Sequence, residues 1–334
     1  MDITFSIIVP VYNRPKEVDE LLNSFDKVEN PTDYEIIIIE DGSLDTCKHV
    51  VDQYQKLPIS YVYQNNAGPG MARNHGAQHA KYNYLIFLDS DVILPQKYLV
   101  NVYQYLIANH LDCFGGPDQD HAEFSNIQKA VDYAMTSFFT TGGIRGNTKS
   151  TKKYEPRSFN LGIKKELFLK IKGFKHIHPG EDPEMIIRLK KETNAKIGFI
   201  PDAKVIHKRR ISLKKFSLQL YKFGLVRPII TQWHPNYDHI TFYFPLLFSL
   251  GLIGSLLFTL FKIYDFIYIY ILYSAIIFTD ALIIKKSLNV AAMSFITTYV
   301  QFISYSYGFA ISFINFRLLN KKPEKTIPKL FFNK

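Results

Sequence analysis

The chain has 334 residues, of which 47% are hydrophobic, and carries 40 Lys and Arg against 30 Asp and Glu, a formal net charge of +10. This length allows two domains, and the two widely separated cysteines exclude a disulfide framework and a cysteine-rich metal site. We find neither a nucleic-acid-binding module nor a pattern of stacking aromatics, so nucleic acid is not the expected partner. An anionic membrane surface explains the positive charge more simply.

The first ninety residues alternate apolar runs with segments of helical periodicity. Apolar runs predict strands at residues 5–9, 34–39, 59–63 and 84–88, and helical spacing predicts helices at residues 16–25 and 70–80. Continuous apolar strands separated by helices indicate a mostly parallel sheet that is covered on both faces. The first run is too short for a secretory signal and follows no basic segment, so we expect a buried strand there.

Three polar clusters follow these strands: Tyr12-Asn13-Arg14, Glu40-Asp41-Gly42-Ser43 and Asp89-Ser90-Asp91. Ligands of such sheets bind beyond the carboxyl ends of the strands, where these clusters should converge. Asp89 and Asp91 flank one small residue, which directs two carboxylates into the same crevice. Mg²⁺ and Mn²⁺ prefer oxygen ligands and keep positions open for phosphates. A polar turn would explain any one cluster alone, but three at one edge predict a binding site.

Five segments, taken together and in this order, resemble family 2 glycosyltransferases of the GT-A fold. Residues 6–14, 40–45, 68–76 and 87–91 resemble the blocks of the nucleotide-binding half, and residues 160–182 resemble the acceptor half. The resemblance covers about residues 3–210. It implies an α/β GT-A nucleotide-sugar-binding domain at 1–210, with a nucleotide-binding half at 1–110 and an acceptor half at 111–210.

The resemblance implies a role for each of several residues. Asp182 would be the general base that activates the acceptor hydroxyl, although an aspartate before Pro183 also suits the N-cap of a helix. Asp91 and His207 would bind Mg²⁺ or Mn²⁺, which neutralises the leaving diphosphate. The residues implied to bind the nucleotide are Pro10, Tyr12, Arg14, Asp41, Arg73 and Asp89. Those implied to contact donor sugar or acceptor are Asn160, Gly162 and Glu181.

Several of these residues also have a purely structural interpretation. Asp41 could form an Asx turn, Arg14 and Arg73 could be solvated surface side chains, and Asn160 could be a turn residue. His207 could simply belong to a basic loop. On the helix after Asp182, Arg188 is predicted to lie at the surface; the alternative is that it pairs with a carboxylate or a phosphate.

The last third of the chain consists of long apolar runs. Residues 240–261 and 263–284 are long enough to cross a bilayer, and residues 290–316 form a third uncharged run. We therefore predict a membrane domain at 239–316 with two or three transmembrane helices; the alternative is a buried helical domain. A basic tail at 317–334 conflicts with three crossings under the positive-inside rule, so the third run could be interfacial or re-entrant.

Residues 211–238 connect the two parts as a basic amphipathic segment. Apolar residues such as Phe216 and Leu220 alternate with lysines, which suits a helix lying on an anionic membrane surface. The alternative is an amphipathic helix that packs on the catalytic domain.

The sequence as a whole predicts an inverting, metal-dependent glycosyltransferase at the cytoplasmic face of the cell membrane. It would move one sugar from a UDP- or GDP-sugar to a glycan or lipid-linked acceptor, in polysaccharide or glycolipid biosynthesis. One alternative is a processive polysaccharide synthase, but Gln219, Arg227 and Trp233 do not have the spacing of that class's Q-x-x-R-W block. The other is a non-catalytic membrane scaffold, against which the intact acidic residues argue.

Overall fold

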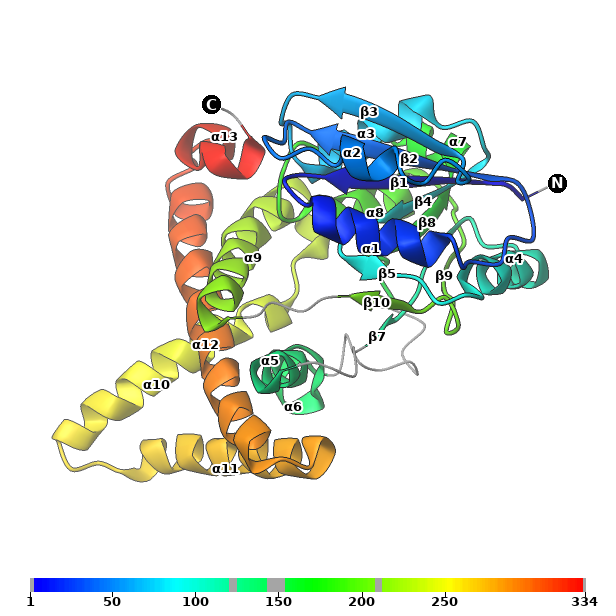
Figure 1. Cartoon of the computed structure of the whole chain (residues 1–334). Coiled ribbons are helices and arrows are strands. Elements are labelled where there is room, and N and C mark those ends of the chain that lie inside the picture. Colours follow the sequence, from blue (N-terminus) through cyan, green and yellow to red (C-terminus); the bar gives the residue numbers. More distant parts are fainter. Residues whose placement is uncertain (1–2, 120–124, 143–153, 208–211, 333–334) are drawn as a thin grey trace. The chain divides into compact units, whose positions relative to one another are not determined.

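The computed structural model describes residues 3–119, 125–142, 154–207 and 212–332, and Figure 1 shows its helices and strands. The chain divides into two compact units. The first comprises Met1–His121, Ser150–Lys208 and Ile327–Lys334, and the second Ala122–Lys149 and Arg209–Thr326. This division differs from the predicted boundaries in two places: Ala122–Lys149 groups with the last third of the chain, and Ile327–Lys334 groups with the first unit.

A seven-stranded sheet with the order β3-β2-β1-β4-β8-β6-β9 forms the centre of the first unit. Its strands are β1 (Phe5–Val11), β2 (Tyr34–Asp41), β3 (Ile59–Gln64), β4 (Tyr84–Leu88), β6 (Cys113–Gly115), β8 (Asn160–Lys164) and β9 (Ile197–Phe199). β1 pairs in parallel with β2 and β4, whereas β8 runs antiparallel between β4 and β6. The mostly parallel sheet confirms the prediction, and the first four strands begin where the apolar runs begin.

Helices cover both faces of this sheet. They are α1 (Pro15–Phe25), α2 (Lys48–Val51), α3 (Pro69–His79), α4 (Tyr98–Asn109), α7 (Lys165–Lys170) and α8 (Glu181–Glu192). Successive side chains of β1 enter opposite cores, as strand geometry requires: Ile7 packs in the core that contains Leu21 of α1, and Ile8 in the core that contains Ala77 of α3. Gly76 lets α3 approach closely, since a Cβ there would lie 2.4 Å from Ile8.

A short second sheet lies beside the end of β4. Its strands are β5 (Val92–Ile93), β10 (Val205–His207) and β7 (Asp118–Gln119), with β10 in the middle. β10 runs antiparallel to β5 and pairs His207 with Val92. The backbone of His207 is therefore held next to the residue that directly follows Asp91.

The second unit is helical. It contains α5 (Asn126–Thr136), α6 (Phe138–Thr141), α9 (Leu213–Trp233), α10 (Phe244–Leu260), α11 (Asp265–Lys285), α12 (Leu288–Phe313) and α13 (Pro323–Thr326), with short 3₁₀ segments at Pro235–Tyr237 and Ile240–Phe242 and a π turn at Ile314–Leu318. α12 packs against α5, α9, α10 and α11. Lys285 of α11 forms an ion pair with Asp132 of α5 at 2.8 Å, and Tyr133 donates to Asp280 at 2.6 Å. These contacts explain why Ala122–Lys149 belongs to this unit.

The predicted basic amphipathic segment forms α9, which begins at Leu213. Its apolar residues Phe216 and Leu220 pack in a core with Val131 of α5. A Cβ at Gly224 would lie 2.1 Å from the carbonyl oxygen of Tyr305, so α9 and α12 touch backbone to backbone. The contacts of this helix given above thus lie within the second unit.

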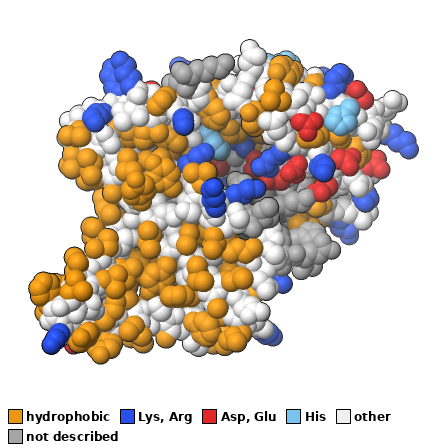
Figure 2. Space-filling model, turned by 60° about the vertical axis from the view of Figure 1, so that its left-hand side comes forward, with side chains coloured by type: hydrophobic (Ala, Val, Ile, Leu, Met, Phe, Trp, Pro, Cys, Tyr) orange, Lys and Arg blue, Asp and Glu red, His pale blue; other side chains and the backbone are white. Residues whose placement is uncertain are grey.

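The apolar runs form helices that differ in length and burial, and therefore in how well they suit a membrane span. Within the described part of the chain, α11 is the one helix long and apolar enough to cross a bilayer, while α10 is apolar but has 17 residues. The first predicted run is shortened because residues 240–242 form a separate 3₁₀ turn. α12 buries many of its side chains against its neighbours. Figure 2 shows hydrophobic side chains covering much of the visible surface of α10 and α11, where Leu260 is 75% exposed.

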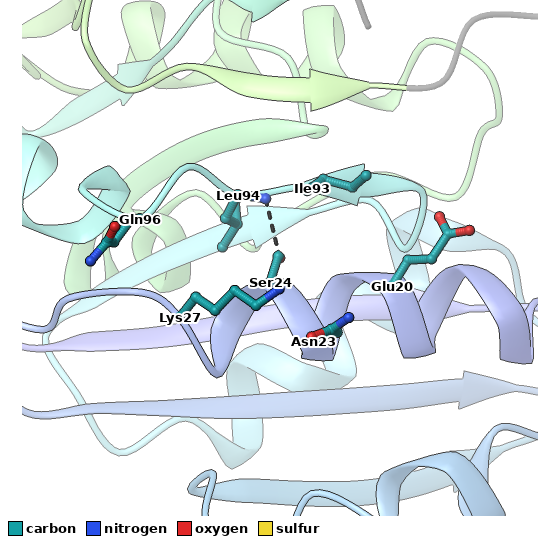
Figure 3. Close-up of a pocket in the computed structure, with 7 residues that line it drawn as sticks. All are labelled: Glu20, Asn23, Ser24, Lys27, Ile93, Leu94 and Gln96. Atoms are coloured by element: carbon teal, nitrogen blue, oxygen red, sulfur yellow. Dashed lines mark hydrogen bonds between the residues drawn. The ribbon is translucent and has the colours of Figure 1, made fainter. Parts of the chain in front are cut away.

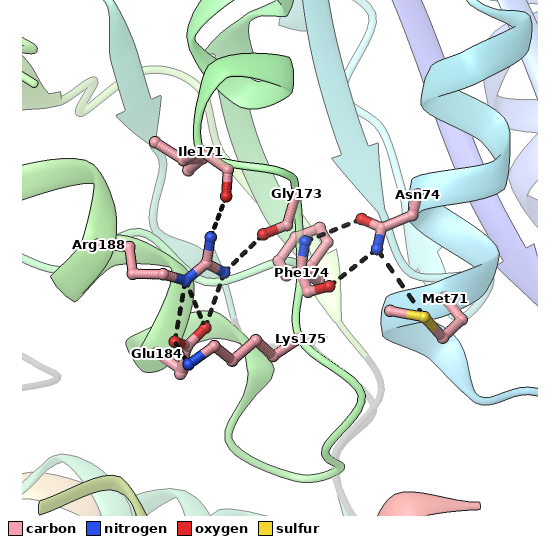
Figure 4. A network of polar contacts seen from close by, with 8 residues as sticks. All are labelled: Met71, Asn74, Ile171, Gly173, Phe174, Lys175, Glu184 and Arg188. Atoms are coloured by element: carbon pink, nitrogen blue, oxygen red, sulfur yellow. Dashed lines mark hydrogen bonds and ion pairs between the residues drawn. The ribbon is translucent and has the colours of Figure 1, made fainter. Parts of the chain in front are cut away.

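The prediction that Arg188 lies at the surface is wrong, and the alternative that it pairs with a carboxylate is confirmed. Its guanidinium is buried, forms an ion pair with Glu184 at 2.7 Å, and donates to the carbonyl oxygens of Ile171 and Gly173 (Figure 4). Lys175 also contacts Glu184, at 3.1 Å. The residue types at positions 184 and 188 suit a surface i,i+4 pair equally well, so only the packing of α8 against the 171–175 loop reveals the burial.

Replacing Arg188 by methionine should lower the free energy of unfolding by about 3–5 kcal/mol, because it removes the guanidinium that pairs with the buried Glu184 carboxylate. Chemical denaturation monitored by circular dichroism measures this. Lys191→Met, at an exposed position of the same helix, is the matched control and should change stability little. Equal stability of the two variants would contradict the buried ion pair.

Candidate active site

The polar clusters after β1, β2 and β4 lie at one edge of the sheet because these three strands are parallel neighbours. The turn after β1 is fixed by Asn13, which adopts a φ of +53° and accepts hydrogen bonds from the amides of Leu44 and Asp45 at 2.9 and 3.1 Å. Its own amide donates to Ser43 at 2.7 Å. The first two clusters are therefore joined, and they hold Arg14 facing the third.

Two arginines bind the acidic triplet. Arg14 forms an ion pair with Asp91 at 2.5 Å, and Arg73 of α3 forms one with Asp89 at 2.6 Å. Arg73 is buried and also reaches Glu181 at the start of α8, at 3.4 Å. Arg73 is 3% exposed, so the interpretation of a solvated surface residue is wrong for it, whereas the ion-paired side chain of Arg14 is 35% exposed. A continuous polar network joins the nucleotide-binding half to the acceptor half.

The carboxylates of Glu181 and Asp182 lie in different environments. Burial opposes ionisation of Glu181, but the ion pairs with His178, at 2.8 Å, and Arg73 outweigh it and lower the pKa of Glu181. Burial and the neighbouring charge of Glu181 raise the pKa of Asp182. Asp182 accepts one hydrogen bond, from the amide of Ser158 at 3.0 Å, and its Oδ1 atom is buried without a partner among the described residues.

Asp182 does not cap its helix, contrary to the structural alternative. α8 begins at Glu181, and its N-cap is Gly180, which has a φ of +115°. Asp182 instead lies within the first turn, where the helix dipole favours a carboxylate. The aspartate–proline pattern predicted a helix with Asp182 as N-cap and Pro183 in its first position, but the helix begins at Glu181, after Gly180.

The side chains of Asp41 and Asn160 are hydrogen-bonded to other residues of the protein. Asp41 accepts hydrogen bonds from Gln64 and from the amides of Ala67 and Gly68, at 2.7–2.9 Å, which ties β2 to the start of α3. Asn160 is buried; it accepts from the Tyr98 hydroxyl and donates to the Ala203 carbonyl oxygen, both at 2.7 Å. A ligand would have to share or replace these bonds, so their predicted contacts stay predictions.

The other predicted residues occupy varied positions. Tyr12 is exposed at the edge of the site, and Pro10 is part of β1. Gly162 lies in the middle of β8, where a Cβ would lie 2.0 Å from the ring of Phe114. Gly162 therefore serves packing within the sheet. The side chain of His207 lies outside the described part of the structure.

Several residues of the site were missed by sequence reasoning. His178 pairs with Glu181 three residues later, and the Asn74 amide group exchanges two hydrogen bonds of 2.8 Å with the backbone of Phe174 (Figure 4). Glu40 is buried and accepts from the amide of Cys47 at 2.8 Å. Glu40 and Asn74 lie within segments that the sequence analysis singled out, but no role was predicted for either residue. For His178 the local signal was its spacing from Glu181.

A pocket of about 310 Å³ lies elsewhere in the first unit (Figure 3). It lies between α1 and the segment after β5, where Ser24 accepts a hydrogen bond from the Leu94 amide at 3.1 Å. None of its lining residues belongs to the polar network described above, so it has no part in the candidate site.

The carboxylates of the site fit a divalent cation by their chemistry. Four carboxylates face the two guanidinium groups of Arg14 and Arg73, which leaves negative charge in excess. The described residues contain no ready-made group of three metal-binding side chains. The oxygens of Asp89 and Asp91 are nevertheless the donors that Mg²⁺ and Mn²⁺ prefer.

Known proteins resemble this chain both in sequence and in fold. Poly(ribitol-phosphate) β-N-acetylglucosaminyltransferase TarS of Staphylococcus aureus is 34% identical over 112 residues, which are 32% of this chain and 20% of TarS. A poly(ribitol-phosphate) β-glucosyltransferase of Bacillus spizizenii is 35% identical over 112 residues, 32% of this chain and 18% of the relative. The matches thus span about a fifth of the length of these relatives.

Two solved structures share the fold. The mannosyltransferase PcManGT of Pyrobaculum calidifontis, in complex with GDP-Man and Mn²⁺, has a TM-score of 0.59 at 15% identity, covering 95% of this chain and 88% of the other. Residues 1–349 of S. aureus TarS, in complex with UDP-GlcNAc, have a TM-score of 0.51 at 18% identity, covering 92% and 91%.

The family assignment follows from the sequence match and the fold together. The family described as "Glycosyl transferase family 2" matches residues 6–172, half of the chain, and this range holds the acidic triplet and both arginines that bind it. The chain belongs to glycosyl transferase family 2 and is a glycosyltransferase with a GT-A-like, mostly parallel sheet.

Proposed function

We propose that this enzyme moves a single sugar, with inversion, from a UDP- or GDP-sugar to a hydroxyl of a glycan or lipid-linked acceptor. The observation that carries the proposal is the network from Asp89 through Arg73 to Glu181, beside a half-buried Asp182 whose Oδ1 atom lacks a partner among the described residues. Such an oxygen can accept a proton, and the network beside it can hold a sugar diphosphate.

In the proposed reaction Asp182 acts as the general base. It takes the proton of the acceptor hydroxyl as that oxygen bonds to the anomeric carbon, while the bond from this carbon to the diphosphate breaks and the nucleoside diphosphate leaves. The raised pKa of Asp182 makes it a better proton acceptor than an ordinary aspartate. The hydrogen bond from the Ser158 amide holds the carboxylate in place.

Asp91 and Asp89, with His207 as a third candidate, would hold Mg²⁺ or Mn²⁺. A bound cation supplies positive charge to the leaving diphosphate. Arg14 and Arg73 already lie at these carboxylates and add fixed positive charge where the negative charge of the leaving group develops. The complex of PcManGT with GDP-Man and Mn²⁺ supports this reading by analogy of fold.

Purified full-length protein in detergent should release UDP or GDP from a matching nucleotide sugar when Mn²⁺ or Mg²⁺ is present. UDP-GlcNAc, UDP-glucose and GDP-mannose are the first donors to test, because proteins similar to this chain are named for the transfer of N-acetylglucosamine, glucose or mannose. The binding of each nucleotide sugar to the purified protein is measured in parallel by calorimetry. A folded protein that neither binds nor hydrolyses any UDP- or GDP-sugar would refute the proposal, and long polymeric products would favour the processive alternative.

We also propose that α10 and α11 attach the enzyme to the cytoplasmic membrane, with the catalytic unit in the cytoplasm. Large apolar side chains on these helices are exposed, for example Leu272 at 63%. Contact of such a large apolar surface with water is unfavourable, and large exposed apolar patches mark membrane or protein interaction sites. A nucleotide-sugar donor is made in the cytoplasm, so the first unit would have to lie on that side. A lipid-linked acceptor would then be within reach of the enzyme at the membrane.

The protein should stay in the membrane fraction after an alkaline carbonate wash and be released by detergent. Ile271→Lys together with Leu272→Lys should weaken this retention, since each charge at the centre of a spanning helix costs about 2.5–3.5 kcal/mol. Leu169→Lys, at an exposed leucine of α7 in the first unit, is the control and should leave retention unchanged. Wild-type protein released by the wash alone would contradict membrane insertion.

A further inference from the structure

The segment Ile327–Phe332 belongs to the catalytic unit, although it follows the apolar helices in sequence. Residues Pro328–Phe331 form a 3₁₀ turn, and Leu330 and Phe331 are each 3% exposed. The carbonyl oxygen of Leu330 accepts a hydrogen bond of 2.8 Å from the amide of His178. The segment is therefore anchored in the first unit by both apolar burial and a backbone bond.

Phe332 contacts two loops of the candidate site at once. Its ring lies against Gly68, where a Cβ would be 2.2 Å from the ring, and stacks on His176 with centroids 6.1 Å apart and planes 20° apart. It also contacts His178, at 6.2 Å between centroids. The amide of Gly68 donates to Asp41, and His178 pairs with Glu181. The ring of Phe332 thus contacts Gly68, which binds the predicted nucleotide contact Asp41, and His178, which binds Glu181 next to the proposed base.

The contacts form an unbroken path into the active site. The Leu330 carbonyl oxygen and the Phe332 ring contact His178. The His178 ring is hydrogen-bonded to Glu181 at 2.8 Å. Glu181 accepts a hydrogen bond from Arg73, which also donates to Asp89. Glu181 lies next to the proposed base in the first turn of α8. A displacement of His178 would therefore also displace the side chain of Glu181 and, next to it, that of Asp182.

We propose that the segment Ile327–Phe332 is part of the active-site wall, and that Phe332 and His178 are positioning residues that set the place of Glu181 and, through it, the catalytic carboxylate. Neither residue is assigned contact with the reacting atoms. This inference rests on the proposed function for its kinetic readout, but the contacts with His178 can be tested without it.

Phe332→Ala in the full-length chain should lower kcat for hydrolysis of UDP-GlcNAc or GDP-mannose about tenfold or more, because small displacements of catalytic groups are costly. The KM for the donor should change less, since the Gly68 amide can still donate to Asp41 and the ion pair of Arg14 with Asp91 lies outside this path. Phe332→Tyr keeps the ring and should restore the rate, whereas Phe332→Leu should not. Lys325→Ala, at an exposed position two residues before the segment, should behave as wild type.

Hydrogen exchange provides the second readout. The amide of His178 bonds to Leu330, so peptides covering residues 176–181 should exchange faster in Phe332→Ala than in wild type or Lys325→Ala. Unchanged kcat and unchanged exchange in a folded Phe332→Ala variant would overturn the inference, and so would a rise in kcat, which would mark the segment as inhibitory. If wild type hydrolyses no nucleotide sugar, the proposed function fails, but the exchange comparison still decides whether the segment holds His178.

Discussion

Asp182→Asn is expected to lower the rate of sugar transfer by about 10²- to 10⁴-fold, the usual contribution of a positioned general base. The amide can still accept the hydrogen bond from the Ser158 backbone through its oxygen, so the fold and the donor affinity should be preserved. The measurement is kcat under saturating donor, with donor binding followed by calorimetry. Glu192→Gln, at the exposed end of the same helix, is the control.

The pH dependence of the wild-type enzyme gives the same hypothesis a second test. Only the deprotonated carboxylate can act as base, so activity should fall as the pH drops through the pKa of Asp182. Burial and the charge of Glu181 raise that pKa above the ordinary aspartate range, so the acid limb should lie at higher pH than an unperturbed aspartate would give. This limb should vanish from the residual activity of Asp182→Asn. An asparagine variant with wild-type rate and an unchanged acid limb would exclude Asp182 as the base.

Asp91→Ala is expected to reduce activity by about 10²- to 10³-fold, because it removes the best-placed candidate metal ligand and metal stabilisation of a leaving phosphate contributes several kcal/mol. It also leaves Arg14 without its 2.5 Å partner. Titration with Mn²⁺ should show saturable binding in wild type and much weaker binding in the variant, which tests the metal site apart from activity. The effect should be specific to the acidic triplet.

Asp52→Ala removes an exposed carboxylate that pairs with Lys48 on α2 and is the matched control. It should bind Mn²⁺ and turn over as wild type does. Full activity of wild type after exhaustive chelation, together with an unimpaired Asp91→Ala variant, would contradict a metal-assisted reaction. In that case Arg14 and Arg73 would be the remaining candidates for stabilising the diphosphate.

The contrast between Asp89 and Arg188 shows what local sequence can predict. Asp89 follows a strand whose residues 84–88 are all apolar, so its position at the carboxyl edge of the sheet was predictable from periodicity alone. Arg188 lies on a helix with a charged neighbour four residues away, a pattern typical of exposed pairs as well as buried ones. Its burial depends on carbonyl groups at residues 171 and 173, which no pattern on the helix reveals.

The pairing of the active-site charges is a further case. Arg14 and Asp91 are 77 residues apart in sequence, and Arg73 and Glu181 are 108 apart. The motifs predicted that these residues share a site, but they could not predict which acid each arginine binds or that His178 and Phe332 support the acceptor side. Such partners depend on the packing of loops whose residues carry no periodic signal.

The sequence by itself determined the parallel sheet, the edge at which its ligand site forms and the family to which the chain belongs, because strand and helix periodicities and contiguous motifs are local properties. Only the tertiary structure decided that the segment 122–149 joins the apolar helices, that Gly180 and not Asp182 is the N-cap of α8, and that residues 327–332 return to the catalytic unit. These outcomes depend on contacts between residues distant in sequence, where burial and hydrogen bonding with particular partners outweigh local preference.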